Sequence, residues 1–189
     1  MSMAPSHPSV KLSKSCTVSR YRDLIAAKNQ ALIADFIVER FEERYFDPIE
    51  IEPRKKNGFT IMAVSCLMVE TLESFRRGWP SSQGKSELAF CSFFSTWDDF
   101  ADFRPVSGDF YKHVRCGILH QAETTGGWRI LRSGPLRNNT TVNATKFART
   151  LRGVLHNYAS SLRTEDWNSS VWQAFRKKMQ AVCRNAEGT

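Results

Sequence analysis

The stretch NATKFARTLRGVLHNYASSL, residues 143–162, decides the fold class of this chain. Its large apolar side chains recur at intervals of mostly three and four residues: Phe147, Leu151, Val154, Leu155, Tyr158 and Leu162. These intervals place them on one face of an α-helix, which turns by about 100° per residue. Asn143 precedes the apolar stripe, and asparagine is a preferred N-cap residue. The sequence therefore predicts an amphipathic helix that begins at Asn143.

The same periodicity extends to both sides of this helix. It predicts further helices over residues 19–45, 59–77, 86–100, from 109 through the following motif, and from 169 or 170 onward. Gly78 is expected to end the second of these helices, and Asp109 is expected to be an N-cap. In residues 128–135 apolar and polar side chains alternate instead, which is typical of one arm of a hairpin. The prediction is an all-α antiparallel helical bundle with a small β-hairpin insertion.

A chain of 189 residues fits a single domain. Residues 1–18 contain Pro5, Pro8 and several serines, with no apolar run of the kind found in signal peptides. They are expected to form a flexible N-terminal tail. Residues 19–185 are expected to form one helical domain.

Charge and cysteine usage restrict the class of protein. The formal net charge of +8 and the sequence pI of about 9.5 favour a polyanionic partner, although charge that only confers solubility is the alternative. The five cysteines form no Cys-x-x-Cys pair, and no histidine stands at zinc-ligand spacing, which indicates reduced thiols and no metal site. No uninterrupted apolar run is long enough to span a membrane. We therefore expect a cytoplasmic protein that does not enter a membrane.

The motif YKHVRCGILHQAE, residues 111–123, carries the chemistry. An arginine side chain holds phosphate with a fixed fork of donors, and histidine exchanges a proton near neutral pH. Cleavage of RNA by its own 2′-hydroxyl needs a proton acceptor, a proton donor and stabilisation of phosphoryl charge. Arg115 is the expected phosphate clamp and His120 the expected general acid or base. The alternative is that Arg115 and His120 form a structural pair.

The spacing of Arg115 and His120 raises a geometric problem. Residues five apart lie about 140° apart around a straight helix, so both cannot face one phosphate. Either Gly117 lets the helix bend, or two copies of the motif face each other across a two-fold axis and form a composite site.

Four other side chains are candidates for supporting roles. His113 lies about two helical turns before His120 and is either a second proton carrier or an ordinary helix histidine. Glu70 or Glu73 is placed to orient Arg115 or His120, with a surface salt bridge as the alternative. Cys116 is expected to be packed rather than reactive.

Residues 110–158, with the Arg115 and His120 motif, the following GGWRI, a Gly-Pro turn and NAxxF, resemble bacterial proteins of the HEPN superfamily. The pattern of that superfamily is an arginine, four to six residues, and a histidine. Glu70, Glu73 and the Gly78-Trp79 pair extend the resemblance, which covers about residues 60–160. The residue after the arginine is commonly polar in the superfamily, whereas this chain has Cys116.

The resemblance implies an all-α bundle that is often a homodimer. Many members are metal-independent endoribonucleases that act as toxins or in defence and need no cofactor. The leading hypothesis is therefore a dimeric ribonuclease with RNA as its substrate, controlled by an antitoxin or a regulatory protein. The alternative is a non-catalytic HEPN module that binds RNA, a nucleotide or a cognate partner protein.

Overall fold

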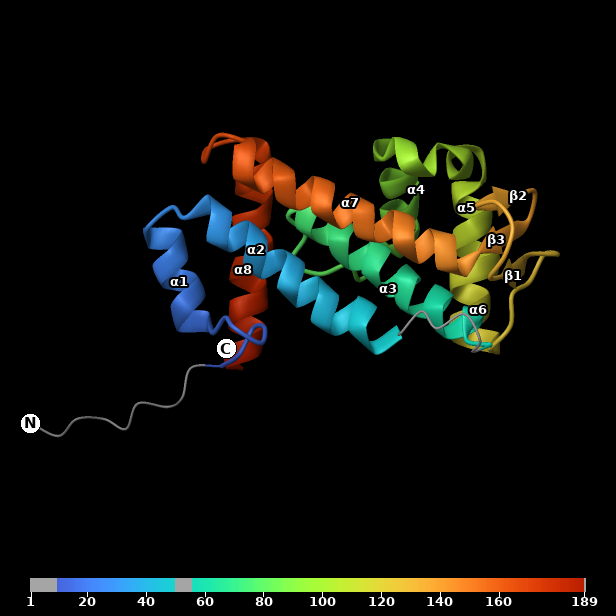
Figure 1. The fold of residues 1–189 in the computed structure, drawn as a ribbon, viewed down its shortest axis with the longest axis horizontal. Helices are drawn as coiled ribbons and strands as arrows, with labels where there is room; N and C mark the ends of the chain where they lie inside the picture. The colour runs from blue at the N-terminus through green and yellow to red at the C-terminus, as the bar shows by residue number, and fades with distance from the viewer. Residues whose placement is uncertain (1–9, 50–55, 189) are drawn as a thin grey trace, which may run out of the picture.

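The computed structural model of the chain describes residues 10–49 and 56–188. Three long helices, α2 (Gln30–Phe41), α3 (Gly58–Arg77) and α7 (Ala144–Thr164), lie side by side at its centre (Figure 1). α2 runs in the opposite direction to α3 and α7. The predicted all-α class is confirmed.

The other helices surround these three. The remaining α-helices are α1 (Val18–Ala26), α4 (Ser86–Thr96), α5 (Ser107–Phe110), α6 (Cys116–Gln121) and α8 (Ser170–Glu187). Segments of other helix types are π-helical at Glu42–Phe46 and Tyr111–Arg115 and 3₁₀ at Asp47–Ile49 and Asp98–Val106. α3 packs against α4, α7 and α8, so it is the central helix of the fold.

The predicted hairpin is part of a small mixed sheet. Its strands are β1 (Arg129–Leu131), β2 (Arg137–Asn138) and β3 (Thr141–Asn143), in the order β1-β3-β2. β2 and β3 form an antiparallel pair, but β1 lies parallel to β3. The arm predicted at residues 128–135 is therefore not paired as in a hairpin. The reason is the loop after β1, where the Asn143 side chain donates to the Gly134 carbonyl at 2.9 Å and holds the crossing to the far side of β3.

Local signals in the sequence correctly predict several helix ends. The Asn143 side chain accepts a hydrogen bond from the Lys146 amide at 3.0 Å, which confirms the predicted N-cap of α7. Gly78 ends α3 with a φ of 65°. A Cβ atom at Gly78 would lie 2.9 Å from the Cα of Ala174 in α8, so packing as well as backbone geometry requires glycine there.

Two helix predictions were wrong. The helix expected over residues 19–45 is broken: Lys28 has a φ of 50°, and the Asn29 side chain caps α2 by accepting from the Leu32 amide at 3.1 Å. Asparagine competes for backbone hydrogen bonds inside a helix, so it favours such a restart. Asp109 is not an N-cap, because α5 begins two residues earlier, at Ser107.

The segment before α1 belongs to the fold as far back as Val10. Leu12 and Cys16 are buried, and the Glu39 carboxylate accepts hydrogen bonds from Ser13 and Ser15. The Leu12 carbonyl accepts from two arginines of the neighbouring helical segment. The flexible tail predicted for residues 1–18 is thus too long at its C-terminal end, and residues 1–9 lie outside the described residues.

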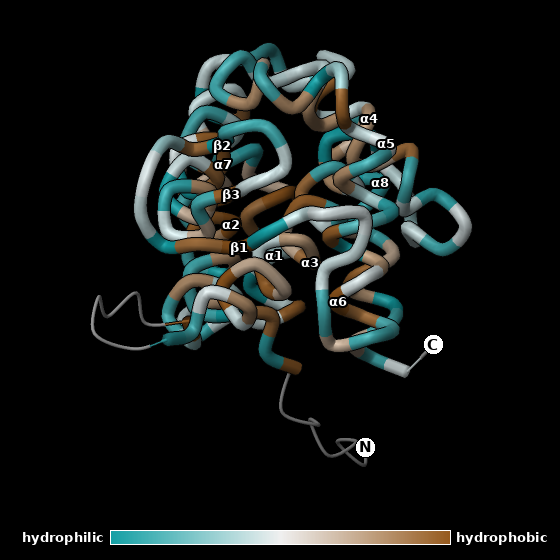
Figure 2. Tube along the Cα trace, turned by 90° about the vertical axis from the view of Figure 1, so that its right-hand side faces the viewer, coloured by the Kyte–Doolittle hydropathy of each residue, from teal (hydrophilic) through white to brown (hydrophobic). Residues whose placement is uncertain are grey.

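The core is dominated by phenylalanine. Seven fully buried rings pack together around the start of the motif helix: Phe90, Phe93, Phe94, Phe100, Phe103, Phe110 and Phe147. Phe110 stacks on Phe147 of α7 with a centroid distance of 5.6 Å and an interplanar angle of 3°. Figure 2 shows the hydrophobic segments gathered inside the hydrophilic ones. Because burial of each ring contributes about 1.5–3 kcal/mol, this cluster fixes the motif helix on α7.

α3 is long and apolar enough to cross a membrane by composition alone. However, 61% of its most apolar window is buried inside the fold, and it carries Glu70 and Glu73. Its apolar length is therefore accounted for by burial in the core of the fold.

Candidate functional site

The motif is interrupted by a π-helical turn at Tyr111–Arg115, between α5 and α6. The Cys116 amide donates to the Tyr111 carbonyl, five residues back. In such a turn, residues five apart become neighbours, so Tyr111 and Cys116 share one face with Arg115. Isolated π turns are frequent at functional sites.

Arg115 is held from across the fold by Glu70 of α3. Its Nε donates to Glu70 Oε1 at 2.7 Å, and the other carboxylate oxygen accepts from the Ser86 hydroxyl at 2.7 Å. The Arg115 and Glu70 side chains are 17% and 9% exposed. Burial lowers the pKa of Arg115, but the hydrogen bond and charge of Glu70 outweigh it and raise that pKa. Arg115 is therefore a fixed cation, and Glu70 is the carboxylate that orients it.

Tyr111 and Cys116 complete the surroundings of the guanidinium. The Arg115 Cζ lies 5.8 Å from the centre of the Tyr111 ring. Interaction of the Tyr111 hydroxyl with the Cys116 side chain, together with burial, raises the pKa of Tyr111. Cys116 is half-buried, so the polar position of the resemblance is occupied here by a thiol with polar contacts.

His120 lies in the last turn of α6, exposed to solvent. In the part of the chain that the structure describes, its ring makes no hydrogen bond or ion pair, and nothing joins it to Arg115. Gly117 does not serve as a bend: it lies inside α6, and a Cβ there would be 2.6 Å from the Glu123 carbonyl oxygen. Its role is to let the loop after α6 pack against the helix.

His113 is directed toward that loop. Its Nδ1 lies 2.8 Å from the Thr125 hydroxyl, and its carbonyl accepts from the Thr125 amide at 3.0 Å. The imidazole packs so closely on Gly126 that a Cβ there would lie 2.6 Å from Nδ1. These contacts give His113 a structural role, and no contact brings it to Arg115 or His120.

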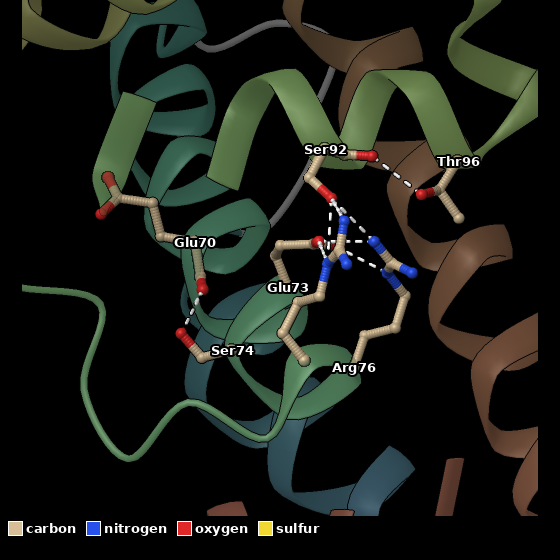
Figure 3. Close-up of polar contacts among 7 residues, drawn as sticks. Glu70, Glu73, Ser74, Arg76, Ser92 and Thr96 are labelled. Carbon is tan, nitrogen blue, oxygen red and sulfur yellow. Dashed lines mark hydrogen bonds and ion pairs between the residues drawn. The ribbon is translucent and has the colours of Figure 1, made fainter. Parts of the chain in front are cut away.

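Glu73 does not orient the motif, because it pairs with its own helix (Figure 3). The carboxylate is fully buried and binds Arg76 through both oxygens, at 2.8 and 2.6 Å. The Arg77 Nε donates to the same carboxylate at 3.1 Å. Residues three and four apart on a helix are neighbours, which explains the choice of partners.

A small apolar pocket of about 90 Å³ adjoins Arg115. It is lined by Ala63, Cys66, Leu67, Arg115, Ile118 and Leu119. Leu67 and Leu119 are 52% and 57% exposed, so α3 and α6 present an apolar face around the guanidinium.

Sequence reasoning missed three contributors to these sites. Tyr111 and Arg115 are four residues apart, so their contact was detectable from the spacing, whereas the contact of Tyr111 with Cys116 depends on the π turn. Ser86 was placed only as the opening residue of α4, and its contact with Glu70 is tertiary. The pairing of Glu73 with Arg76 and Arg77 was detectable, because the i,i+3 and i,i+4 spacings are visible in the sequence.

Within residues 10–49 and 56–188, no three His, Cys, Asp or Glu side chains are grouped as metal ligands. Comparison with protein-family models, curated proteins and solved structures found no significant match. The functional argument therefore depends on the residues of this chain.

Proposed function

We propose that this protein is a HEPN-type endoribonuclease that works without a metal, as a cytoplasmic homodimer in a toxin–antitoxin or defence system. The observation that carries the proposal is the Nε contact of Arg115 with Glu70. An arginine held through Nε keeps its terminal amino groups in a fixed plane. Such donors stabilise phosphoryl charge without reorganising during the reaction.

The proposed reaction forms a bond between the 2′-oxygen and phosphorus and breaks the bond to the 5′-oxygen. One group takes the proton of the 2′-hydroxyl, and another protonates the leaving 5′-oxygen. Arg115 binds the non-bridging oxygens. The products are a 2′,3′-cyclic phosphate and a free 5′-hydroxyl.

His120 is the proposed proton carrier, and its exposed position favours a site shared by two chains. Two copies of the motif across a two-fold axis supply two histidines, one as acid and one as base. The exposed Leu67 and Leu119 surround Arg115, and a second copy would bury them. Arg115 and His120 lie about 140° apart around one helix, and Gly117 does not bend that helix. A shared site would let the arginine of one chain and the histidine of the other face the same phosphate.

The second candidate is a non-catalytic HEPN module that binds RNA, a nucleotide or a partner such as an antitoxin. The observation in its favour is that no described residue orients the His120 ring. Binding through Arg115 requires no such orientation.

The test is incubation of cellular RNA with purified protein in EDTA, followed by mapping of product ends. We expect wild type to cleave and to leave 2′,3′-cyclic phosphates, and His120→Ala and Arg115→Ala to be inactive but folded. His156→Ala is the control, because His156 is a comparably exposed histidine on α7, 56% exposed. RNA that is bound but left intact by wild type would favour the module. Light scattering that shows only monomers would remove the composite site.

A further inference from the structure

A second arginine cluster lies at the C-terminal end of α3, apart from Arg115. Arg76 and Arg77 both bind the buried Glu73, and both donate to the Ser92 hydroxyl of α4 (Figure 3). The Arg76 Nη2 and the Arg77 Nε lie 2.9 and 3.2 Å from Ser92 Oγ. Two guanidinium groups are therefore held against the same two oxygen-bearing side chains.

The charges in this cluster do not balance. Two arginines face one carboxylate, so the count is +2 − 1 = +1. Glu73 is fully buried, whereas the Arg76 and Arg77 side chains are 23% and 47% exposed. The negative charge is thus on the inner side, and the excess positive charge faces solvent. The C-terminal end of α3 favours cations there, but the two like charges still repel each other.

The hydrogen-bond donors of the cluster are not all used. Glu73 and Ser92 take the Nε and Nη2 atoms of both arginines. Neither Nη1 has a partner among the described residues. A phosphate accepts several such donors at once and would offset the excess charge. We propose that Arg76 and Arg77 form a phosphate-binding site that is separate from the Arg115 site.

The position of this site fits a strand of RNA, and this part of the inference rests on the proposed function. Glu70 and Glu73 are one turn apart on α3, and their serine partners, Ser86 and Ser92, both lie on α4. At 1.5 Å per residue, the seven residues from Glu70 to Arg77 span about 10 Å, or about three nucleotides of a stacked strand. The second site would bind a backbone phosphate near the one that Arg115 holds. A free nucleotide or inorganic phosphate offers the same chemistry.

The experiment measures binding of a 12-nucleotide RNA, 2′-O-methylated throughout so that it is not cleaved, by fluorescence anisotropy over a range of KCl. Arg77→Gln is the main variant, because Arg76 still neutralises Glu73. Arg77→Lys is the second variant, which keeps the charge but loses the fork. Arg163→Gln is the matched control: Arg163 is in the last turn of α7, is 39% exposed and pairs with one carboxylate.

We expect Arg77→Gln to reduce the slope of log affinity against log salt by about 0.7, since one contact to a single strand is lost. If the two proteins bind equally at 1 M KCl, this difference in slope corresponds to an affinity about eightfold lower at 50 mM KCl. Arg77→Lys should fall between wild type and Arg77→Gln, and Arg163→Gln should bind as wild type does. Equal RNA binding by all four proteins, with a phosphate-induced rise in Tm that only Arg77→Gln lacks, would assign the site to a small phosphate ligand.

RNA binding and phosphate-induced stabilisation that are both independent of Arg77 would overturn the inference. Cleavage of unmodified RNA, measured in parallel, separates it from the proposed function. If wild type does not cleave but binds RNA through Arg77, the phosphate site is supported and the ribonuclease is rejected.

Discussion

The two carboxylates of α3 hold arginine in different ways. Glu73 binds Arg76 and Arg77, three and four residues further along its own helix, whereas Glu70 binds Arg115, 45 residues away in sequence. The pairs of Glu73 with Arg76 and Arg77 need only the helical spacing of α3, although the contacts of both arginines with Ser92 also need α4. The Glu70 contact exists only after the motif helix has packed on the core, so the comparison separates a local ion pair from a tertiary one that depends on the fold.

The largest expected effect on stability is at Glu73. Glu73→Gln leaves two arginines without their counter-charge beside a buried amide. Loss of one partner of a buried ion pair costs about 3–5 kcal/mol, and we expect about 2–3 kcal/mol here because both arginines are partly exposed. Urea unfolding measures this. A loss below 1 kcal/mol would mean that the cluster behaves as a surface ion pair.

Glu70→Gln tests the tertiary pair. We expect a loss of about 1–2 kcal/mol in stability, since Arg115 retains some exposure, and a fall of about 10- to 100-fold in RNA cleavage because the guanidinium is no longer fixed. Glu42→Gln is the control, because Glu42 pairs with Arg152 and both side chains are more exposed. Equal cleavage by Glu70→Gln and wild type would exclude an orienting role for Glu70.

Tyr111→Phe tests how much the tyrosine hydroxyl stabilises the π turn. The substitution removes the hydroxyl that interacts with Cys116 and keeps the ring beside Arg115. We expect a loss of about 1 kcal/mol in thermal unfolding experiments, typical of one hydrogen bond. If Tyr111→Phe is as stable as wild type, the hydroxyl makes no net contribution to the π turn.

The smallest effect concerns Glu39, a carboxylate whose hydrogen bonds come from serines. Burial raises the pKa of Glu39, but hydrogen bonds from Ser13 and Ser15 outweigh it and keep the pKa below its usual value. The stability that these bonds give is present above the unfolded pKa and is lost as pH falls through the folded pKa. We expect amide exchange near Ser15 to increase, relative to the rest of the chain, as pH falls from 5 to 3. Glu39→Gln should lack this pH dependence.

The sequence predicts the features of the fold that depend on interactions between residues close together in the chain. The apolar stripe of α7, the cap at Asn143 and the end of α3 at Gly78 all follow from periodicity and backbone preference. The parallel pairing of β1 does not, because it depends on a side-chain contact that forms only in the folded chain. The break at Lys28 had a local signal in Asn29, but the apolar periodicity on both sides predicted one continuous helix.

The residues of the candidate site show the same difference between local and tertiary features. Arg115 and His120 were identified from residue chemistry, and Glu70 was one of two carboxylates considered. The sequence did not decide between Glu70 and Glu73, since both lie on the same helix one turn apart. It also did not place Tyr111 beside Cys116, because an α-helical register separates residues five apart, although Tyr111 and Arg115 stand at neighbouring i,i+4 positions.

The π turn holds one more residue than an α-helical turn, because its backbone hydrogen bond spans five residues instead of four. Removing one residue between Tyr111 and Arg115 would close it to regular α-helix with little net rotation of the segment that follows. Phe110 would remain stacked on Phe147, and Arg115 would still face Glu70. The turn is thus a place where the chain length can vary, and a relative with one residue fewer here would reach the same carboxylate with its arginine.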